Sequence, residues 1–104
     1  MPTPAATSTR SWTFLTNHAH VLLVISLDPE IRQREIADAV GITLGAAQRI
    51  VHDLEEAGYL ASERIGRRNR YQLAGDLPLR HPLEQDRTVT DLLSALHSSD
   101  SSVE

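Results

Sequence analysis

The stretch GITLGAAQRIVHDLEEAGYL, residues 41–60, decides the fold. Its Thr43 is a typical N-cap residue, and the apolar residues that follow it recur at spacings of three and four, as in an amphipathic helix. These apolar residues are Ala46, Ala47, Ile50, Val51, Leu54 and Ala57. Because Gly58 supplies a stop, we expect a helix that is capped by Thr43 and runs to Ala57.

A shorter helix is predicted directly before it, from Arg32 to Ala39, with Gly41 placed to cap its end. Its expected buried residues are Ile36, Ala37 and Val40. The connection VGIT is short enough to require a tight angle, and the small side chain of Ala37 lets the two helices approach closely. This is the sequence pattern of a helix-turn-helix.

The flanking sequence completes the fold. Residues 12–27 form a further predicted helix, which ends at Asp28-Pro29 because the residue before a proline is pushed out of helical geometry. After residue 58, the β-prone runs YLASERI and RYQLA are joined by Gly66–Asn69, which indicates a hairpin. The predicted class is mainly α with a small antiparallel β-hairpin: a winged helix-turn-helix over residues 12–75, plus a C-terminal helix.

Three segments carry a resemblance to known proteins: GITLGAAQRIVHDLEEAGYL, GRRNRYQL and LPLRHPLE. Over about Trp12 to Leu96 the chain resembles winged-helix regulators of the MarR and ArsR type, and most of all a group of small bacterial proteins with this pattern. The resemblance implies a transcriptional regulator that binds duplex DNA.

The distribution of charge is compatible with DNA binding. The chain of 104 residues has a net charge of −4, and all ten of its basic residues are arginine. Four of them crowd into residues 64–70, and a hairpin tip of this kind can lie along a DNA backbone or enter a minor groove, where negative potential attracts arginine. The candidate wing residues are Arg64, Arg67, Arg68, Asn69 and Arg70. A solvated turn or a docking site for an acidic protein is the alternative.

The helix that begins after Thr43 is the candidate recognition helix, whose N-terminal part enters the major groove in this class. Gln48 suits adenine, Arg49 suits guanine or a phosphate, and the Thr43 hydroxyl suits a phosphate. The full candidate set is Thr43, Leu44, Gly45, Gln48, Arg49 and His52. Alternatively, Arg49 pairs within the helix with Asp53. The small residues of LGAA offer few hydrogen bonds to bases. We therefore expect the wing to contribute more of the binding to DNA.

A final helix is expected to open at Thr88, since Thr88-x-x-Asp91 resembles a capping box. Relatives of this fold use their first and last helices to form a two-fold dimer, and we expect the same here. The candidate interface residues are Trp12, Leu15, Val89, Leu92, Leu93 and Leu96. The alternative is that this helix folds back on its own domain. The expected organisation is a disordered tail (1–11), the DNA-binding domain (12–75), a linker and dimerisation helix (76–97) and a second tail (98–104).

Other functional classes have little support in the sequence. There is no cysteine, no convincing catalytic set and no glycine-rich phosphate loop, so neither an enzyme nor a cofactor is predicted. His18 and His20 would lie on different faces of a helix, so no metal site is expected. The longest apolar run, VLLVI, is too short for a membrane span, and the first residues do not resemble a signal peptide. The cytoplasm is the expected location.

The predicted function is therefore a cytoplasmic, homodimeric repressor that binds double-stranded DNA. The rival is a winged-helix module that docks an acidic protein partner without binding DNA. MarR-type proteins often hold a ligand between their dimerisation and DNA-binding parts, and this shorter chain is expected to leave little room for one. The sequence assigns no effector, no operator and no role to His81.

Overall fold

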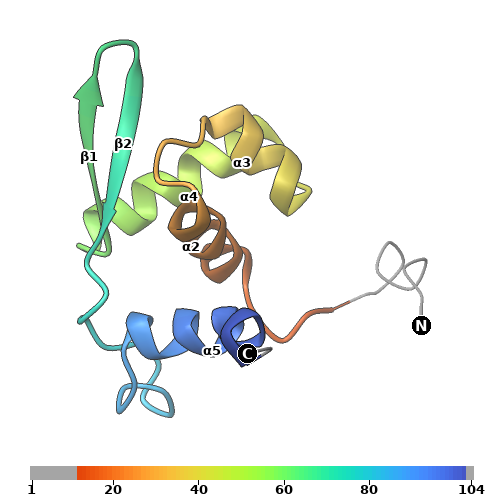
Figure 1. Ribbon diagram of the computed structural model, residues 1–104, viewed down its shortest axis with the longest axis vertical. Coiled ribbons are helices and arrows are strands. Elements are labelled where there is room, and N and C mark those ends of the chain that lie inside the picture. The colour runs from red at the N-terminus through yellow and green to blue at the C-terminus, as the bar shows by residue number, and fades with distance from the viewer. Residues whose placement is uncertain (1–11, 103–104) are drawn as a thin grey trace.

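The computed structural model describes residues 12–102. These residues form four helices and one antiparallel sheet of two strands (Figure 1). In chain order the elements are α2 (Asn17–Leu27), α3 (Gln33–Val40), α4 (Leu44–Glu56), β1 (Leu60–Ile65), β2 (Arg68–Leu73) and α5 (Val89–Ser102). The predicted class, mainly α with a small antiparallel hairpin, is confirmed.

Helices α3 and α4 meet through small residues. Ala37 of α3 and Ala47 of α4 are both buried. Gly41 caps α3 with a φ of 87°, a left-handed conformation that glycine adopts without steric cost, and its N–H donates to the carbonyl of Ala37 at 2.8 Å. The Oγ1 of Thr43 then accepts from the N–H of Ala46 at 3.0 Å and caps α4. The tight turn predicted between two helices is therefore present. Thr43 caps α4 as expected, and the helix ends at Glu56 with Ala57 as its C-cap, one residue before the predicted end.

Helix α2 packs against both helices of this pair. Val21 and Ile25 are fully buried. The helix begins at Asn17 rather than at Trp12, because the side chain of Thr16 takes the N-cap position and accepts from the N–H of Ala19 at 3.4 Å. The prediction of a longer helix was wrong at this end.

The hairpin has a tighter turn than predicted. Its register runs from Leu60 opposite Leu73 to Ile65 opposite Arg68, which leaves only Gly66 and Arg67 in the turn. Gly66 has a φ of 62°, as the first central residue of a type II′ turn requires. In Figure 1 the hairpin projects from the C-terminal end of α4, on the side of the molecule away from α5.

Helix α5 packs on the core of its own chain. Its expected capping box is present, since the N–H of Thr88 donates to Asp91 at 3.0 Å and the N–H of Asp91 donates to Thr88 at 3.2 Å. Val89 is 2% exposed and Leu93 is 7% exposed, and both belong to the same core as α2 and α4. In this structure both side chains are covered from within the chain, as the alternative of a helix folded back on its own domain expects, and their role in a dimer stays a prediction.

The C-terminal tail is shorter than predicted, because α5 continues to Ser102 rather than ending at residue 97. The predicted tail at residues 1–11 lies outside the described residues, as do residues 103–104. Within residues 12–102, every helix is too short or too polar to span a lipid bilayer.

Candidate nucleic-acid interface

The first turns of α4 present an exposed surface with little negative charge. Gln48 and Arg49 are exposed, and the first turn contains no acidic residue. The Thr43 hydroxyl accepts one hydrogen bond inside the cap and keeps its own proton available for an outside acceptor. This end of a helix favours an anion, because its free N–H groups point outward.

Arg49 and His52 of α4 differ in their contacts with acidic residues. The intrahelical alternative for Arg49 is not seen, since Asp53 pairs instead with His18 of α2, at 2.9 Å between Nε2 and Oδ2. His52 lies 3.4 Å from Glu56, one turn further on, and both side chains are largely exposed. Arg49 therefore has no acidic partner among residues 12–97, whereas His52 has one.

Gly45 has no structural requirement within the chain. A Cβ placed on it would meet no atom within 4 Å, and its φ is not in the left-handed region. Glycine costs a helix about 0.5–1 kcal/mol relative to alanine. Gly45 therefore costs stability and avoids no clash among the described residues. Such a glycine suits a place where another molecule approaches the backbone.

Replacing Gly45 by alanine should therefore strengthen the fold and weaken DNA binding. Gly45→Ala should raise the free energy of unfolding by about 0.5–1 kcal/mol, measured by urea denaturation. The same methyl group should weaken duplex binding about 10-fold, because steric overpacking costs about 1–3 kcal/mol. A variant that is more stable and binds DNA as tightly as the native chain would mean that the backbone of α4 does not approach the duplex closely.

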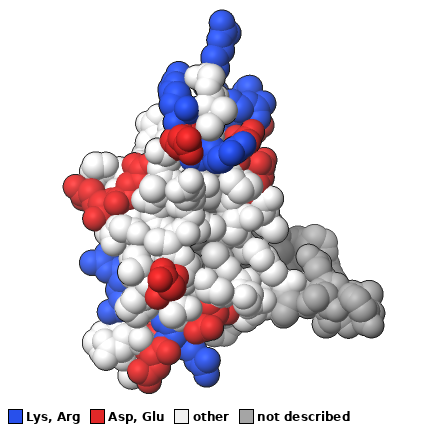
Figure 2. Space-filling model, turned by 60° about the vertical axis from the view of Figure 1, so that its left-hand side comes forward, with Lys and Arg blue, Asp and Glu red and all other residues white. Residues whose placement is uncertain are grey.

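The register of the hairpin divides the arginines of the wing between two faces. The pairs on one face are Ser62–Tyr71 and Arg64–Asn69, and those on the other are Glu63–Arg70 and Ile65–Arg68. Arg64 thus shares its face with neutral side chains, whereas Arg70 lies opposite Glu63. Arg67 occupies the turn. Figure 2 shows the arginines gathered at the tip of the hairpin, with acidic side chains directly beneath them.

The cationic surface is partly neutralised from within the chain. Glu30, in the connection between α2 and α3, accepts from Nη2 of Arg70 at 2.8 Å and from its Nε at 3.2 Å. It also lies 3.9 Å from Nη1 of Arg68. Among the described residues, Arg64 and Arg67 have no acidic partner. The five predicted wing residues therefore do not act alike: two arginines are paired and two are free.

A recess of about 180 Å³ separates the wing from the start of α3. Its lining includes Arg67, Arg68 and Asn69 from the wing, and Arg32 from the N-cap of α3. Sequence reasoning missed Arg32, because it lies far from the wing in the chain and carries no local pattern that suggests a DNA contact.

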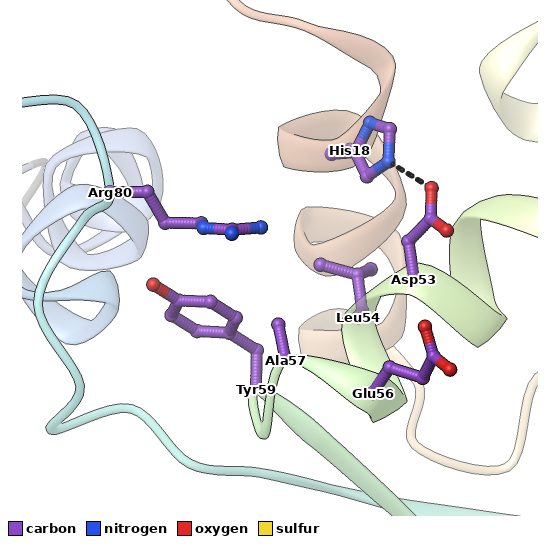
Figure 3. Close-up of a pocket in the computed structure, with 7 residues that line it drawn as sticks. All are labelled: His18, Asp53, Leu54, Glu56, Ala57, Tyr59 and Arg80. Carbon is purple, nitrogen blue, oxygen red and sulfur yellow. Dashed lines mark hydrogen bonds and ion pairs between the residues drawn. The ribbon is translucent and has the colours of Figure 1, made fainter.

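The far end of α4 lines a groove rather than the candidate DNA surface. Figure 3 shows His18 of α2 and Asp53 of α4 joined on one side of it, while Arg80 reaches in from the segment before α5. The groove measures about 510 Å³ and continues into an apolar part of about 390 Å³ that Leu15 and Leu92 line. Both parts of the groove are open to solvent, and the expectation that the chain leaves little room for a ligand stays a prediction. Within residues 12–102 no three His, Asp or Glu side chains are placed to hold a metal ion.

His81 has a local role. Its Nδ1 accepts from the N–H of Leu83 at 3.0 Å, and its carbonyl accepts from the N–H of Glu84 at 2.8 Å. The first bond requires an unprotonated Nδ1. These bonds order the loop that precedes α5.

A helix-turn-helix followed by a two-stranded wing defines the class of winged helix-turn-helix proteins. A model of the MarR family matches residues 13–68, more than half of the sequence, and the chain belongs to that family. No curated protein matches the chain. Family membership indicates a DNA-binding transcription regulator; the ArsR side of the resemblance gains no support.

Proposed function

We propose that this protein is a repressor that binds duplex DNA as a homodimer. In this proposal the N-terminal half of α4 enters the major groove, where Gln48 and Arg49 reach base edges and Thr43 binds a phosphate. The wing follows the backbone or enters the adjacent minor groove. Occupying an operator is the simplest way for such a protein to act.

Arg64 and Arg67 carry the proposal. Both are exposed at the end of the hairpin and neither has an acidic partner among the described residues, so their charge is available to a phosphate. Asp53, near the end of α4, does not oppose them, because it pairs with His18 in the groove. A chain with net negative charge can therefore present a local cationic surface.

The proposed dimer uses the apolar residues that remain uncovered. Trp12 is 66% exposed and Leu96 is 39% exposed, while Leu15 and Leu92 are partly buried at the edge of the groove. A two-fold arrangement would place two copies of α4 about 34–36 Å apart, one turn of DNA.

Duplex binding as a function of salt tests the proposal. Fluorescence anisotropy with a random-sequence duplex should show affinity that falls linearly on a log–log plot between about 50 and 200 mM salt, with a slope of about −0.9 for each neutralised phosphate. Absence of binding at the lowest salt would favour the rival function, in which the arginines dock an acidic protein.

A further inference from the structure

Hydrogen bonds join the wing to the connection between α2 and α3. The N–H of Tyr71 in β2 donates to the carbonyl of Pro29 at 2.8 Å, and the Tyr71 hydroxyl accepts from Gln33 at 3.4 Å. Tyr71 itself is buried. These contacts hold the connection beside β2 and bring Glu30, the residue after Pro29, to the edge of the wing.

Glu30 reaches two arginines that lie on the same face of the hairpin. One of its oxygens accepts both bonds from Arg70, and the other faces Arg68. The hydrogen bond and the charge of Glu30 raise the pKa of Arg70 above its ordinary value, with a smaller contribution from Glu63. A carboxylate that engages guanidinium groups in this way occupies donors that a phosphate would use.

The contact with Glu30 can orient the arginines, but it does not prevent them from binding another anion. The side chains of Arg70 and Glu30 are 49% and 40% exposed, so water and salt screen the pair. Exposed ion pairs of this kind contribute little to stability. A DNA phosphate that arrives beside them can therefore compete with the carboxylate.

The neighbouring recess is the natural place for that phosphate. Arg32, Arg67 and Arg68 line it from two elements, and Glu30 is the acidic residue in its wall. Three arginines therefore line a small hollow, and one carboxylate in the same wall contacts one of them.

We propose that Glu30 is an internal competitor for DNA phosphate, which holds Arg68 and Arg70 in the free protein and so limits the affinity of the wing for DNA. This inference rests on the proposed function and adds a residue that sets its strength. Glu30 would lower the number of phosphates that the free chain can neutralise without a rearrangement of its side chains.

Glu30→Gln tests this directly, because it keeps the shape of the side chain and removes its charge. The salt slope for duplex binding should become steeper by about 0.9 for each phosphate newly contacted. At 0.1 M salt the affinity should rise by up to about 5-fold, because the exposed ion pair that is removed holds the arginines only weakly. Unchanged affinity and slope would overturn the proposal, and so would weaker binding, which would mean that Glu30 only positions the wing.

Two comparisons separate release of the arginines from a general effect of charge. Asp38→Asn removes a carboxylate from an exposed position on α3 that contacts no arginine of the wing, and it should change affinity much less than Glu30→Gln. In a chain that already carries Arg68→Gln and Arg70→Gln, the gain from Glu30→Gln should disappear, because coupled residues are not additive. A gain that persists there would also overturn the proposal.

Retention on immobilised heparin distinguishes this inference from the proposed function. Heparin is a polyanion without bases, so it competes with Glu30 whether or not the protein is a DNA regulator. If no duplex binds but Glu30→Gln elutes at higher salt than the native chain, the competitor role holds and the DNA function fails. If the native chain binds duplex and Glu30→Gln changes neither measurement, the DNA function stands and the competitor role fails.

Discussion

Replacing Arg64 and Arg67 together by glutamine is expected to weaken duplex binding about 60-fold at 0.1 M salt. Each lost phosphate contact makes the salt slope shallower by about 0.9, which is a factor of about 8 between 1 M and 0.1 M salt. These two arginines have no acidic partner in the described chain, so their loss is not offset by release of an internal ion pair. Anisotropy titrations at several salt concentrations measure both effects.

Arg80→Gln with Arg87→Gln is the matched control. It removes the same number of positive charges from the segment before α5, which lies at the end of the molecule away from the wing (Figure 1). This variant should keep nearly the native slope. Equal losses in the two double variants would show that binding follows total charge rather than the wing, and the assignment of the wing as the contact surface would then be wrong.

Local patterns were sufficient to predict the helix-turn-helix. The caps of α4 could be read from Thr43 and from the end of the apolar periodicity at Ala57, because both signals depend only on neighbouring residues. The start of α2 was misplaced for a related reason: apolar residues near Trp12 extend the pattern, but the cap formed by Thr16 decides where the helix begins. That threonine was visible in the sequence and was outweighed by the periodicity.

The surface that α5 covers could not be predicted in the same way. An apolar stripe shows that a helix is buried on one side but not against which surface. Here the backbone of residues 77–79 leads the chain back to its own core, where the N–H of Val89 donates to the carbonyl of Leu77 at 3.1 Å. This contact depends on the path of a segment whose prolines obscure any regular pattern.

Local sequence patterns were equally limited in predicting the candidate site. The cluster of arginines was evident in the sequence, yet their division into paired and free residues was not, because Glu30 lies forty residues from Arg70 in the chain. Strand alternation predicts which arginines share a face once the register is known, but the turn was placed too long. Only the three-dimensional structure relates Glu30 and Arg32 to the wing.

Leu93→Ala is expected to lower the free energy of unfolding by about 2–5 kcal/mol, the usual cost of removing a buried leucine side chain. Leu93 is 7% exposed and packs in the core that α2 and α4 share. For a domain of this size the loss corresponds to a fall in Tm of more than about 10 °C. Thermal unfolding followed by circular dichroism measures it, and the fall should be the same at low and high protein concentration.

Leu96→Ala provides the contrast, because Leu96 is on the same helix but 39% exposed. Its loss should cost little stability in a single chain and should raise the dissociation constant of the proposed dimer, measured by analytical ultracentrifugation. If instead Leu93→Ala lowers Tm only at concentrations where the protein is dimeric, then α5 packs on a partner chain in solution. The concentration dependence of the two variants thus decides whether this helix completes its own domain or joins two copies of it.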